Sequence, residues 1–431
     1  MSDLVQDPGR VRDLSAAMAR GELTADALVR RCLARIAAVD GKVQAWVAVQ
    51  ADMALGAAQA LDAERRAGRV RGPLHGIPVA VKDVIDVAGL PTRANSPSRA
   101  EALPATADAT VVAHLRAAGA IILGKVHTTE YAYYESRPPT RNPYDLTRTP
   151  GGSSAGSGAA IASGTVPLAL GTQTAGSVNR PAAYTGVGAF KPSTLAIGGT
   201  GVVPLAPSFD TVGAFGASAA DAALLAAGYA ADHLRLRAPA PVTPLLVVLE
   251  DAMVTAKIAP GTAAAVAALT ERFAAAKLAV RRAMAPVPLE VLLATHRTVM
   301  LAELGRTHRR LPMDRIAPRL AQDIEAGLSI LDTEYQAALA TLAGYRQAFW
   351  SAFGADELLL LPAAPDVAPE ASTTGDPSFV IPTTALGGPV ATLRAGMDGA
   401  LPVGALLFGA PGADARLAGF LLSETGTGLG L

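Results

Sequence analysis

The chain has 431 residues, and several residue types are scarce in it. It contains one cysteine, Cys32, so it cannot form an internal disulfide, as is typical of proteins from a reducing compartment. Only 17% of the residues are charged, and 37 basic side chains balance 37 acidic ones. A nucleic-acid partner is therefore not expected, because proteins that bind polyanions usually carry a basic excess. Half of the residues are hydrophobic, but only 4% are aromatic. Most of the apolar side chains are therefore small or aliphatic, which suits helices packed closely against a sheet.

Long uninterrupted apolar runs are also missing. The longest apolar stretches, at 159–170 and 212–231, are broken by Gly, Pro, Ser or Asp, whereas a membrane-spanning helix needs roughly 20 apolar residues. Residues 1–12 are polar and lack the apolar core of a secretory signal. We therefore expect a cytoplasmic protein without a membrane partner.

The spacing of apolar residues predicts helices that alternate with short buried strands. Helices are expected over about 13–66, at 110–118 and through most of the Ala-rich region 219–353. The predicted strands are 76–81, 120–125, 244–249, 356–362 and 386–409. No repeat or linker divides the chain. These features predict one α/β domain over residues 1–431, with a mixed central sheet covered by helices on both faces.

The most unusual segment is rich in Gly and Ser and covers residues 151–158. It lacks the lysine and the spacing of a phosphate-binding P-loop, which argues against a nucleotide site. Residues 152–156 do match G-x-S-x-G, the pattern that places a nucleophilic serine, here Ser154, in α/β-hydrolases. That mechanism also needs a downstream histidine. The available ones, His233, His296 and His308, lie in helix-like contexts beside charged residues and are expected at the surface.

A serine can instead be activated by a neutral lysine. Lys82 ends a strongly apolar predicted strand, so it would emerge at the sheet edge beside the Gly/Ser loops. Burial disfavours the charged form of a lysine and would keep it neutral. Considered alone, Lys82 could equally end a strand in solvent.

Three segments together resemble the amidase signature family. They are 72–83 (GPLHGIPVAVKD), 149–157 (TPGGSSAGS) and 170–177 (LGTQTAGS), followed by Arg180-Pro181-Ala182 and 188–192 (GAFKP). Residues 387–389 and 401–404 resemble the closing segment of the family. The resemblance runs from about residue 13 to the C-terminus, with the catalytic motifs within 72–192. The first serine of the second segment and the last of the third, Ser153 and Ser177, stand 24 positions apart, which is the spacing of the family.

The resemblance implies a Ser-Ser-Lys amidohydrolase. Ser177 would be the nucleophile that forms an acyl-enzyme, Ser153 would relay the proton after a cis peptide bond, and neutral Lys82 would be the base. The backbone N–H groups of Thr174, Ala175, Gly176 and Ser177 would form the oxyanion hole. The expected substrate is a small-molecule amide. No metal or other cofactor is expected, because no His, Cys or Asp cluster has the spacing of metal ligands.

The substrate pocket is less well defined by the sequence. Three tyrosines, Tyr131, Tyr133 and Tyr134, form a cluster in a chain that has few aromatic residues. Tyr133 is the best candidate for contact with substrate. A role for the three rings in a packed aromatic core is an equal alternative. Gln173 is a second candidate. The remaining polar residues, Ser154, Ser157 and Asp210, are expected in structural roles, the two serines in turns or capping a helix at 158.

The chain departs from the family pattern at three positions. Many relatives have Asp where Gln173 stands, Gly where Ala175 stands and Arg where Asn179 stands, and here Arg180 lies one position later. Because these positions adjoin the nucleophile loop, the departures bear on substrate choice.

Two alternative functions remain open on the sequence. The same three catalytic residues would serve for a carbamate (urethane) or a urea-like C–N bond. The chain would also suit the A subunit of a tRNA-dependent amidotransferase, which needs partner subunits, although Gln173 and Ala175 count against that. A homodimer is also left open.

Overall fold

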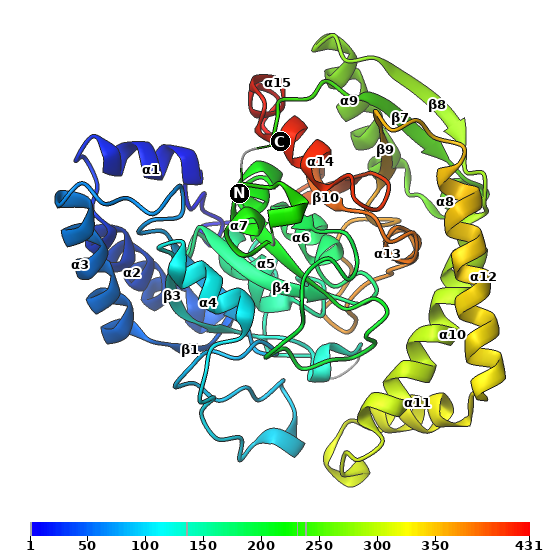
Figure 1. Cartoon of the computed structure of the whole chain (residues 1–431), viewed down its shortest axis with the longest axis horizontal. Coiled ribbons are helices and arrows are strands. Elements are labelled where there is room, and N and C mark those ends of the chain that lie inside the picture. Colours follow the sequence, from blue (N-terminus) through cyan, green and yellow to red (C-terminus); the bar gives the residue numbers. More distant parts are fainter. Residues whose placement is uncertain (1, 135–136, 231, 238) are drawn as a thin grey trace.

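Eleven strands join into one mixed sheet in the computed structural model, which describes residues 2–134, 137–230, 232–237 and 239–431 (Figure 1). The strands are β1 (Trp46–Val49), β2 (Pro78–Lys82), β3 (Ile121–Val126), β4 (Leu168–Gln173), β5 (Gly188–Lys191), β6 (Thr211–Gly216), β7 (Leu245–Glu250), β8 (Val280–Met284), β9 (Glu357–Pro362), β10 (Val390–Asp398) and β11 (Leu401–Phe408). Their order across the sheet is β1-β3-β2-β4-β6-β5-β10-β11-β9-β7-β8. β2 pairs in parallel with both β3 and β4, whereas β4, β6, β5, β10, β11 and β9 pair antiparallel in turn.

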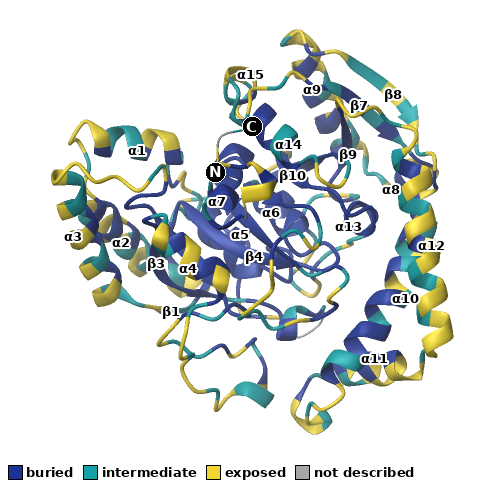
Figure 2. Ribbon diagram, in the orientation of Figure 1, coloured by how far each residue is buried: buried dark blue, intermediate teal, exposed yellow. Residues whose placement is uncertain are grey.

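Helices flank this sheet, as the sequence predicts. The α-helices are α1 (Val11–Ala19), α2 (Ala25–Val43), α3 (Ala51–Arg66), α4 (Thr110–Ala117), α5 (Ala155–Ala162), α6 (Asn179–Thr185), α7 (Ala219–Tyr229), α8 (Ala252–Lys257), α9 (Pro260–Ala275), α10 (Leu289–His308), α11 (Pro318–Ser329), α12 (Asp332–Trp350), α13 (Ile381–Ala385), α14 (Asp414–Leu422) and α15 (Glu424–Gly428). Among them α5 and α6 are buried along their whole length (Figure 2). No described helix is both long and apolar enough to cross a membrane.

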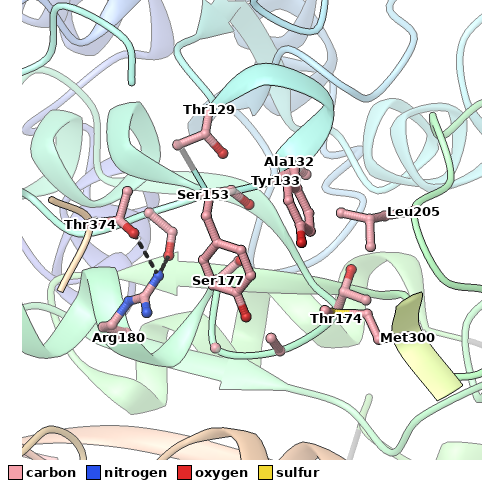
Figure 3. A pocket seen from close by; sticks show the side chains of 14 residues that line it. Thr129, Ala132, Tyr133, Ser153, Thr174, Ser177, Arg180, Leu205, Met300 and Thr374 are labelled. Atoms are coloured by element: carbon pink, nitrogen blue, oxygen red, sulfur yellow. Dashed lines mark hydrogen bonds between the residues drawn. The ribbon is translucent and has the colours of Figure 1, made fainter. Parts of the chain in front are cut away.

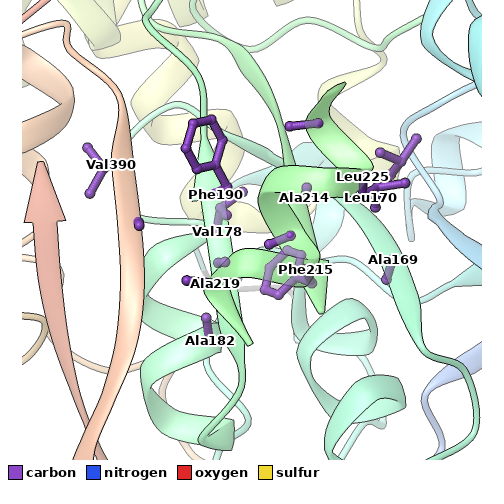
Figure 4. Close-up of a cluster of buried hydrophobic side chains, with 14 of the residues drawn as sticks. Ala169, Leu170, Val178, Ala182, Phe190, Ala214, Phe215, Ala219, Leu225 and Val390 are labelled. Atoms are coloured by element: carbon purple, nitrogen blue, oxygen red, sulfur yellow. The ribbon is translucent and has the colours of Figure 1, made fainter. Parts of the chain in front are cut away.

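Small residues allow the helices to approach the sheet closely. In the core around β4, β5 and β6, Phe190 and Phe215 fill the space between Ala and Val side chains (Figure 4). A Cβ atom added at Gly188 of β5 would overlap the backbone of Ser218, where α7 begins. The abundance of Ala and Gly therefore reflects close contact between helix and sheet.

Helix α10 packs against both α11 and α12, and the three form an elongated arm at one side of the molecule (Figure 1). The outward face of α12 is exposed (Figure 2). The inner helix, α10, contacts α13 and carries buried residues toward the centre of the molecule. This arm therefore brings His296 to Thr174, 122 positions earlier in the chain, and Glu303 to Ser208, 95 positions earlier.

The predicted strands near 76–81, 120–125, 244–249, 356–362 and 386–409 are all present, with small shifts at their ends. Strand β1 interrupts the predicted helical region 13–66, and β8 interrupts the region 219–353. Strand β8 is only partly buried at the sheet edge, so it carries no apolar run that would have marked it. Strands β4, β5 and β6 are not predicted either, because they lie among Gly-rich segments. Helix α5 begins at Ala155, three positions before the predicted start.

Candidate active site

Lys82 stands at the carboxyl end of β2, and its side chain is completely buried. Its Nζ lies 2.7 Å from Ser153 Oγ and 2.7 Å from Thr172 Oγ1. Thr172 belongs to β4, the parallel neighbour of β2, so the sheet itself brings the lysine and this hydroxyl together. The sequence-based expectation that Lys82 leaves the strand beside the Gly/Ser loops agrees with this geometry.

Burial changes the charge state of this lysine. Desolvation lowers the pKa of Lys82 well below its ordinary value of 10.5, and the negative charge of Asp210 only partly opposes this. No carboxylate lies within ion-pair distance of Lys82 among the described residues. Burial therefore favours the neutral form of Lys82, which is the form that can accept a proton.

Ser153 follows a cis peptide bond from Gly152, as the resemblance implies. It lies just before α5, and only 3% of its surface is exposed. The hydroxyls of its neighbours point elsewhere: Ser154 Oγ contacts the backbone of Thr172, and Ser157 Oγ donates to the carbonyl of Leu170. Ser154 occupies the N-cap position of α5 but makes no cap hydrogen bond, so the predicted capping role is wrong and both serines fasten α5 to β4.

Ser177 lies at the end of the loop that follows β4, and its 8% exposure makes it the most accessible of the three predicted catalytic residues. Ser177 and Ser153 line the same narrow cavity (Figure 3). The two segments are joined by a hydrogen bond from the N–H of Ser154 to the carbonyl of Ser177, at 3.3 Å. Among the described contacts, the hydroxyls of Ser153 and Ser177 are not yet hydrogen bonded to each other, as is common in catalytic sites without substrate.

Hydrogen bonds to its carbonyl groups hold the loop Thr174–Ser177 in place. The carbonyl of Thr174 accepts a hydrogen bond from His296 Nε2 of α10 at 2.8 Å, and the carbonyl of Ala175 accepts one from Thr384 Oγ1 of α13 at 2.6 Å. No described group accepts from the backbone N–H groups of Thr174–Ser177. Because a trans peptide directs its N–H away from its C=O, fixing these carbonyls leaves unpaired N–H donors on the opposite side of the loop.

Asp210 holds the start of the same loop. Its carboxylate accepts from the hydroxyl of Thr174 at 2.5 Å and from the backbone N–H groups of Leu205 and Ala206. Desolvation raises the pKa of Asp210, and these hydrogen bonds oppose the rise. The structural role expected for Asp210 agrees with these contacts.

Gln173, the second candidate for contact with substrate, is not among the residues that line this cavity. Its Oε1 accepts from the N–H groups of Val178 and Asn179, and its Nε2 donates to Asn179 Oδ1 and Thr384 Oγ1. The side chain is completely buried. Two of the departures from the family pattern, Gln173 and Asn179, thus contact each other as a neutral pair.

Tyr133 does line the cavity, and its hydroxyl donates to Asp323 Oδ2 of α11 at 2.8 Å. The ring of Tyr133 packs edge-on against Tyr134, which lines the same cavity. Tyr131 is turned away from the described cavity lining, and its ring packs against His308. The tyrosine cluster therefore divides into two wall residues and one packing residue.

The cavity is small, with a volume of about 20 Å³, enough for about one water molecule. Besides the residues already described it is lined by Thr129, Ala132, Gly152, Arg180, Leu205, Met300 and Thr374. A second, largely apolar cavity of about 280 Å³ shares Ala132, Thr174 and Leu205 with it, so the two adjoin. The larger cavity is formed mainly by residues 195–212.

The comparison with known families decides the classification. The family model described as Amidase matches residues 27–418, which is most of the chain. The chain belongs to the Amidase family. The sequence resemblance and the expected fold class are thereby confirmed.

Two solved structures similar to this Amidase-family chain support the same fold. The first belongs to a vestigial protein complex that is described as revealing the evolutionary origins of an s-triazine catabolic enzyme. It superposes with a TM-score of 0.86 at 28% sequence identity, and the match covers 96% of this chain and 98% of that one. The native peptide amidase from Stenotrophomonas maltophilia superposes with a TM-score of 0.78 at 27% identity, covering 95% of each chain.

Curated relatives of this Amidase-family chain match only part of it. The A subunit of glutamyl-tRNA(Gln) amidotransferase from Acidothermus cellulolyticus is 44% identical over 250 residues, covering 56% of this chain and 49% of that protein. The protein of the same name from Anaeromyxobacter sp. (strain K) is 46% identical over 220 residues, covering 50% and 44%. The chain thus spans about half the length of these curated relatives.

The sequence did not reveal three of the groups that shape the site. His296 and His308 are buried, although the sequence predicts them at the surface. Both belong to α10, which packs between the loops of the site and the other helices of the arm. His233 is exposed, as predicted. Thr384 is the third group. Its only signal in the sequence is proximity to the closing segment of the family, and its contact with Ala175 joins residues 209 positions apart.

Proposed function

We propose that this chain is a serine amidohydrolase that cleaves the C–N bond of a small amide. One observation carries the proposal: a buried Lys82 contacts Ser153, and Ser153 shares a cavity with Ser177 and its loop of unpaired N–H groups. A base, a relay, a nucleophile and an oxyanion-binding loop are the parts that acyl transfer requires.

The reaction follows from these positions. As Ser177 Oγ attacks the carbonyl carbon of the substrate, its proton passes to Ser153 Oγ, and the proton of Ser153 passes to the neutral amine of Lys82. The negative charge that develops on the carbonyl oxygen is stabilised by the N–H groups of residues 174–177. The proton then returns through Ser153 to the leaving nitrogen, the C–N bond breaks, and Ser177 is left acylated. Water, deprotonated by the same route, releases the acid.

The same parts serve the alternative functions. A carbamate or a urea-like substrate would acylate Ser177 in the same way. The similarity to the A subunits of amidotransferases supports an amidotransferase role as a second candidate, in which partner subunits would be needed. Copurification of partner subunits, with glutaminase activity that appears only in their presence, would favour that candidate.

The test compares serine variants on a panel of aliphatic amides, anilides, carbamates and ureas. Ser177→Ala should abolish turnover, and mass spectrometry of the wild-type protein should find the acyl group on the peptide that contains Ser177. Ser154→Ala is the matched control, because that hydroxyl contacts only the backbone of β4; it should retain a measurable fraction of activity. The opposite result would restore the G-x-S-x-G hypothesis centred on Ser154.

A further inference from the structure

The large cavity of about 280 Å³ adjoins the small cavity beside Ser177, and the proposed reaction leaves it without a role. Ala132, Thr174 and Leu205 line both cavities, so these three residues form the boundary between them. Figure 3 shows Thr174 and Leu205 on the side of the small cavity away from Arg180. The large cavity therefore extends the space at Ser177 in one direction.

The wall of the large cavity is mainly apolar. It is built from the segment 195–212, and Ile197, Val203 and Val212 are among its apolar side chains. Gly198 and Gly199 also line it, and no atom lies within 4 Å of a Cβ atom added at either glycine. An apolar cavity of about 150 Å³ already holds a benzene molecule. The large cavity therefore has room for a single ring with a short substituent.

Each polar side chain among the lining residues already has a hydrogen-bond partner. Thr172 Oγ1 lies 2.7 Å from Lys82 Nζ, and Thr211 Oγ1 donates to a backbone carbonyl at 2.9 Å. The hydroxyl of Thr174 donates to Asp210, whose carboxylate also accepts from two backbone N–H groups. A polar ligand would find no free side-chain partner here, whereas an apolar group gains by leaving water.

The large cavity also lies on the side of the base. Thr172, one of its lining residues, contacts Lys82, and Lys82 contacts Ser153. In the proposed reaction the leaving nitrogen takes its proton from Ser153, so the nitrogen must face this side. A substituent on the nitrogen is thus directed toward the large cavity. The acyl part stays beside Ser177 in the small cavity, whose volume of about 20 Å³ favours a short acyl group.

We propose that the large cavity, formed mainly by residues 195–212, binds the nitrogen substituent of the substrate and that this substituent is a compact apolar ring. This inference rests on the proposed function, because it places the amide carbonyl at Ser177. The preferred substrate is then a secondary amide with a short acyl group and an aryl or cycloalkyl group on its nitrogen. Its hydrolysis consumes one water molecule and releases a short carboxylic acid and an apolar amine.

The first test uses the wild-type protein and two isomers. Acetanilide carries its ring on the nitrogen, and phenylacetamide carries the same ring on the acyl side. We expect kcat/KM for acetanilide to exceed the values for phenylacetamide and acetamide by about tenfold or more, because the ring is buried. N-cyclohexylacetamide should likewise exceed N-methylacetamide, which separates burial from the electronic effect of an aryl group. Equal values, or a preference for phenylacetamide, would overturn the proposal.

The second test changes the size of the cavity at Ile197. Ile197→Phe should lower kcat/KM for acetanilide by about tenfold and leave that for acetamide unchanged, because the larger side chain occupies the space of the substrate ring. Ile197→Ala should shift the preference toward N-naphthylacetamide, and it provides the same test if Ile197→Phe does not fold.

The matched controls are Ile258→Phe and Ile258→Ala. Ile258 follows α8, is partly buried and lines neither cavity. Both controls should keep the wild-type ratio of kcat/KM for acetanilide over acetamide. Wild-type ratios in both Ile197 variants, with folding verified by circular dichroism, would show that the ring binds elsewhere.

A binding measurement separates this proposal from the proposed function. Calorimetry with Ser177→Ala, which should not turn over substrate, is expected to show tighter binding of acetanilide than of acetamide or phenylacetamide. If no amide is hydrolysed and Ser177 is never acylated, the proposed function fails. If all three amides are hydrolysed at Ser177 equally well, and bind equally to Ser177→Ala, only the apolar site fails.

Discussion

Lys82 ends β2 with its side chain buried between the hydroxyls of Ser153 and Thr172. Neither neighbour is charged, so the protonated amine would lose its hydration without gaining a counter-ion. The charge of Asp210 acts from beyond hydrogen-bond contact and only partly offsets this loss. The location of Lys82 thus favours the neutral amine, which the proposed mechanism needs as its base.

This placement predicts the direction of the pH dependence. Because the pKa of Lys82 is lowered well below 10.5, kcat/KM should rise as pH passes upward through that lowered pKa and level off before 10.5. Activity should fall on acidification, since protonated Lys82 cannot accept the proton from Ser153. The measurement is kcat/KM from pH 5 to 10 with a neutral amide. A rise centred at the ordinary lysine pKa would contradict the assignment.

His296 does not itself line the cavity, but it contacts the loop 174–177, which does. Since the carbonyl of Thr174 only accepts, Nε2 of His296 must carry the proton. Burial lowers the pKa of His296 to about 4, so the ring is neutral in the working range. A hydrogen bond to this carbonyl fixes the peptide whose N–H belongs to Ala175, and it also polarises that N–H.

Removing this contact should therefore slow turnover more than it weakens binding. We expect His296→Leu to lower kcat about fivefold, corresponding to about 1 kcal/mol for a lost hydrogen bond, with little change in KM. His296→Gln retains an N–H donor and should recover part of kcat. If both variants lose stability equally while kcat is unchanged, His296 is only a packing residue.

At the scale of the element, the site depends on how closely α5 approaches the sheet. Gly156 in the first turn of α5 leaves no room for a side chain, since an added Cβ would overlap the backbone of His127 and Ala45. The residues that follow β3 and precede β1 therefore set the position of the helix. Because Ser153 lies two positions before the first residue of α5, the position of the helix also affects the distance between Ser153 and Lys82.

Two glycine-to-alanine changes test this element-scale dependence. Gly156→Ala should destabilise the protein by about 1–3 kcal/mol and lower kcat, because overpacking would displace α5. Gly344 lies in the middle of α12 on its exposed face, and no atom is close to a Cβ added there. Gly344→Ala should therefore raise the free energy of unfolding by about 0.5–1 kcal/mol through the higher helix propensity of alanine, and kcat should stay normal. Urea denaturation and kinetics measure both. A neutral result for Gly156→Ala would refute the packing argument.

At the scale of the whole molecule, the sheet runs without interruption from β1 to β8. The strands β9, β7 and β8 at one end of the sheet are joined to the others by the pairing of β9 with β11. Both β9 and β11 are fully buried. Separating the β9-β7-β8 edge would expose both of them to water.

We therefore expect the chain to unfold as one unit. Calorimetry should give a single transition for the wild type, with the same midpoint whether followed by tryptophan fluorescence or by circular dichroism. Two resolved transitions would show that the 219–353 region is a separate unit.

Metal removal is a second test on the whole protein. No group of three or more His, Cys, Asp or Glu side chains within the described residues could hold a metal ion. Turnover should thus be unchanged after dialysis against EDTA, since in the proposed mechanism Lys82 and Ser153 supply the base and the relay. Loss of activity that added divalent metal restores would contradict the Ser-Ser-Lys mechanism.

The sequence alone pointed to Lys82, Ser153 and Ser177, and to the small-residue loop before the nucleophile. Local chemistry made them candidates, but the resemblance to the amidase signature family assigned their roles, since Lys82 considered alone could equally end a strand in solvent. The fold class was also predictable, since apolar periodicity separates helices from buried strands. Edge strand β8 and the short β1 were missed because their burial depends on neighbours distant in sequence.

Only the tertiary structure decided what surrounds those residues. The contact of His296 with Thr174 joins positions 122 apart, and that of Gln173 with Thr384 joins positions 211 apart. Lys82 and Arg180 are both buried without a carboxylate at ion-pair distance among the described residues, and this cannot be derived from their neighbours in the chain. Residue types and local spacing determine which chemistry is available. Packing between distant segments determines which charges are desolvated, which donors stay free and therefore which substrate the site favours.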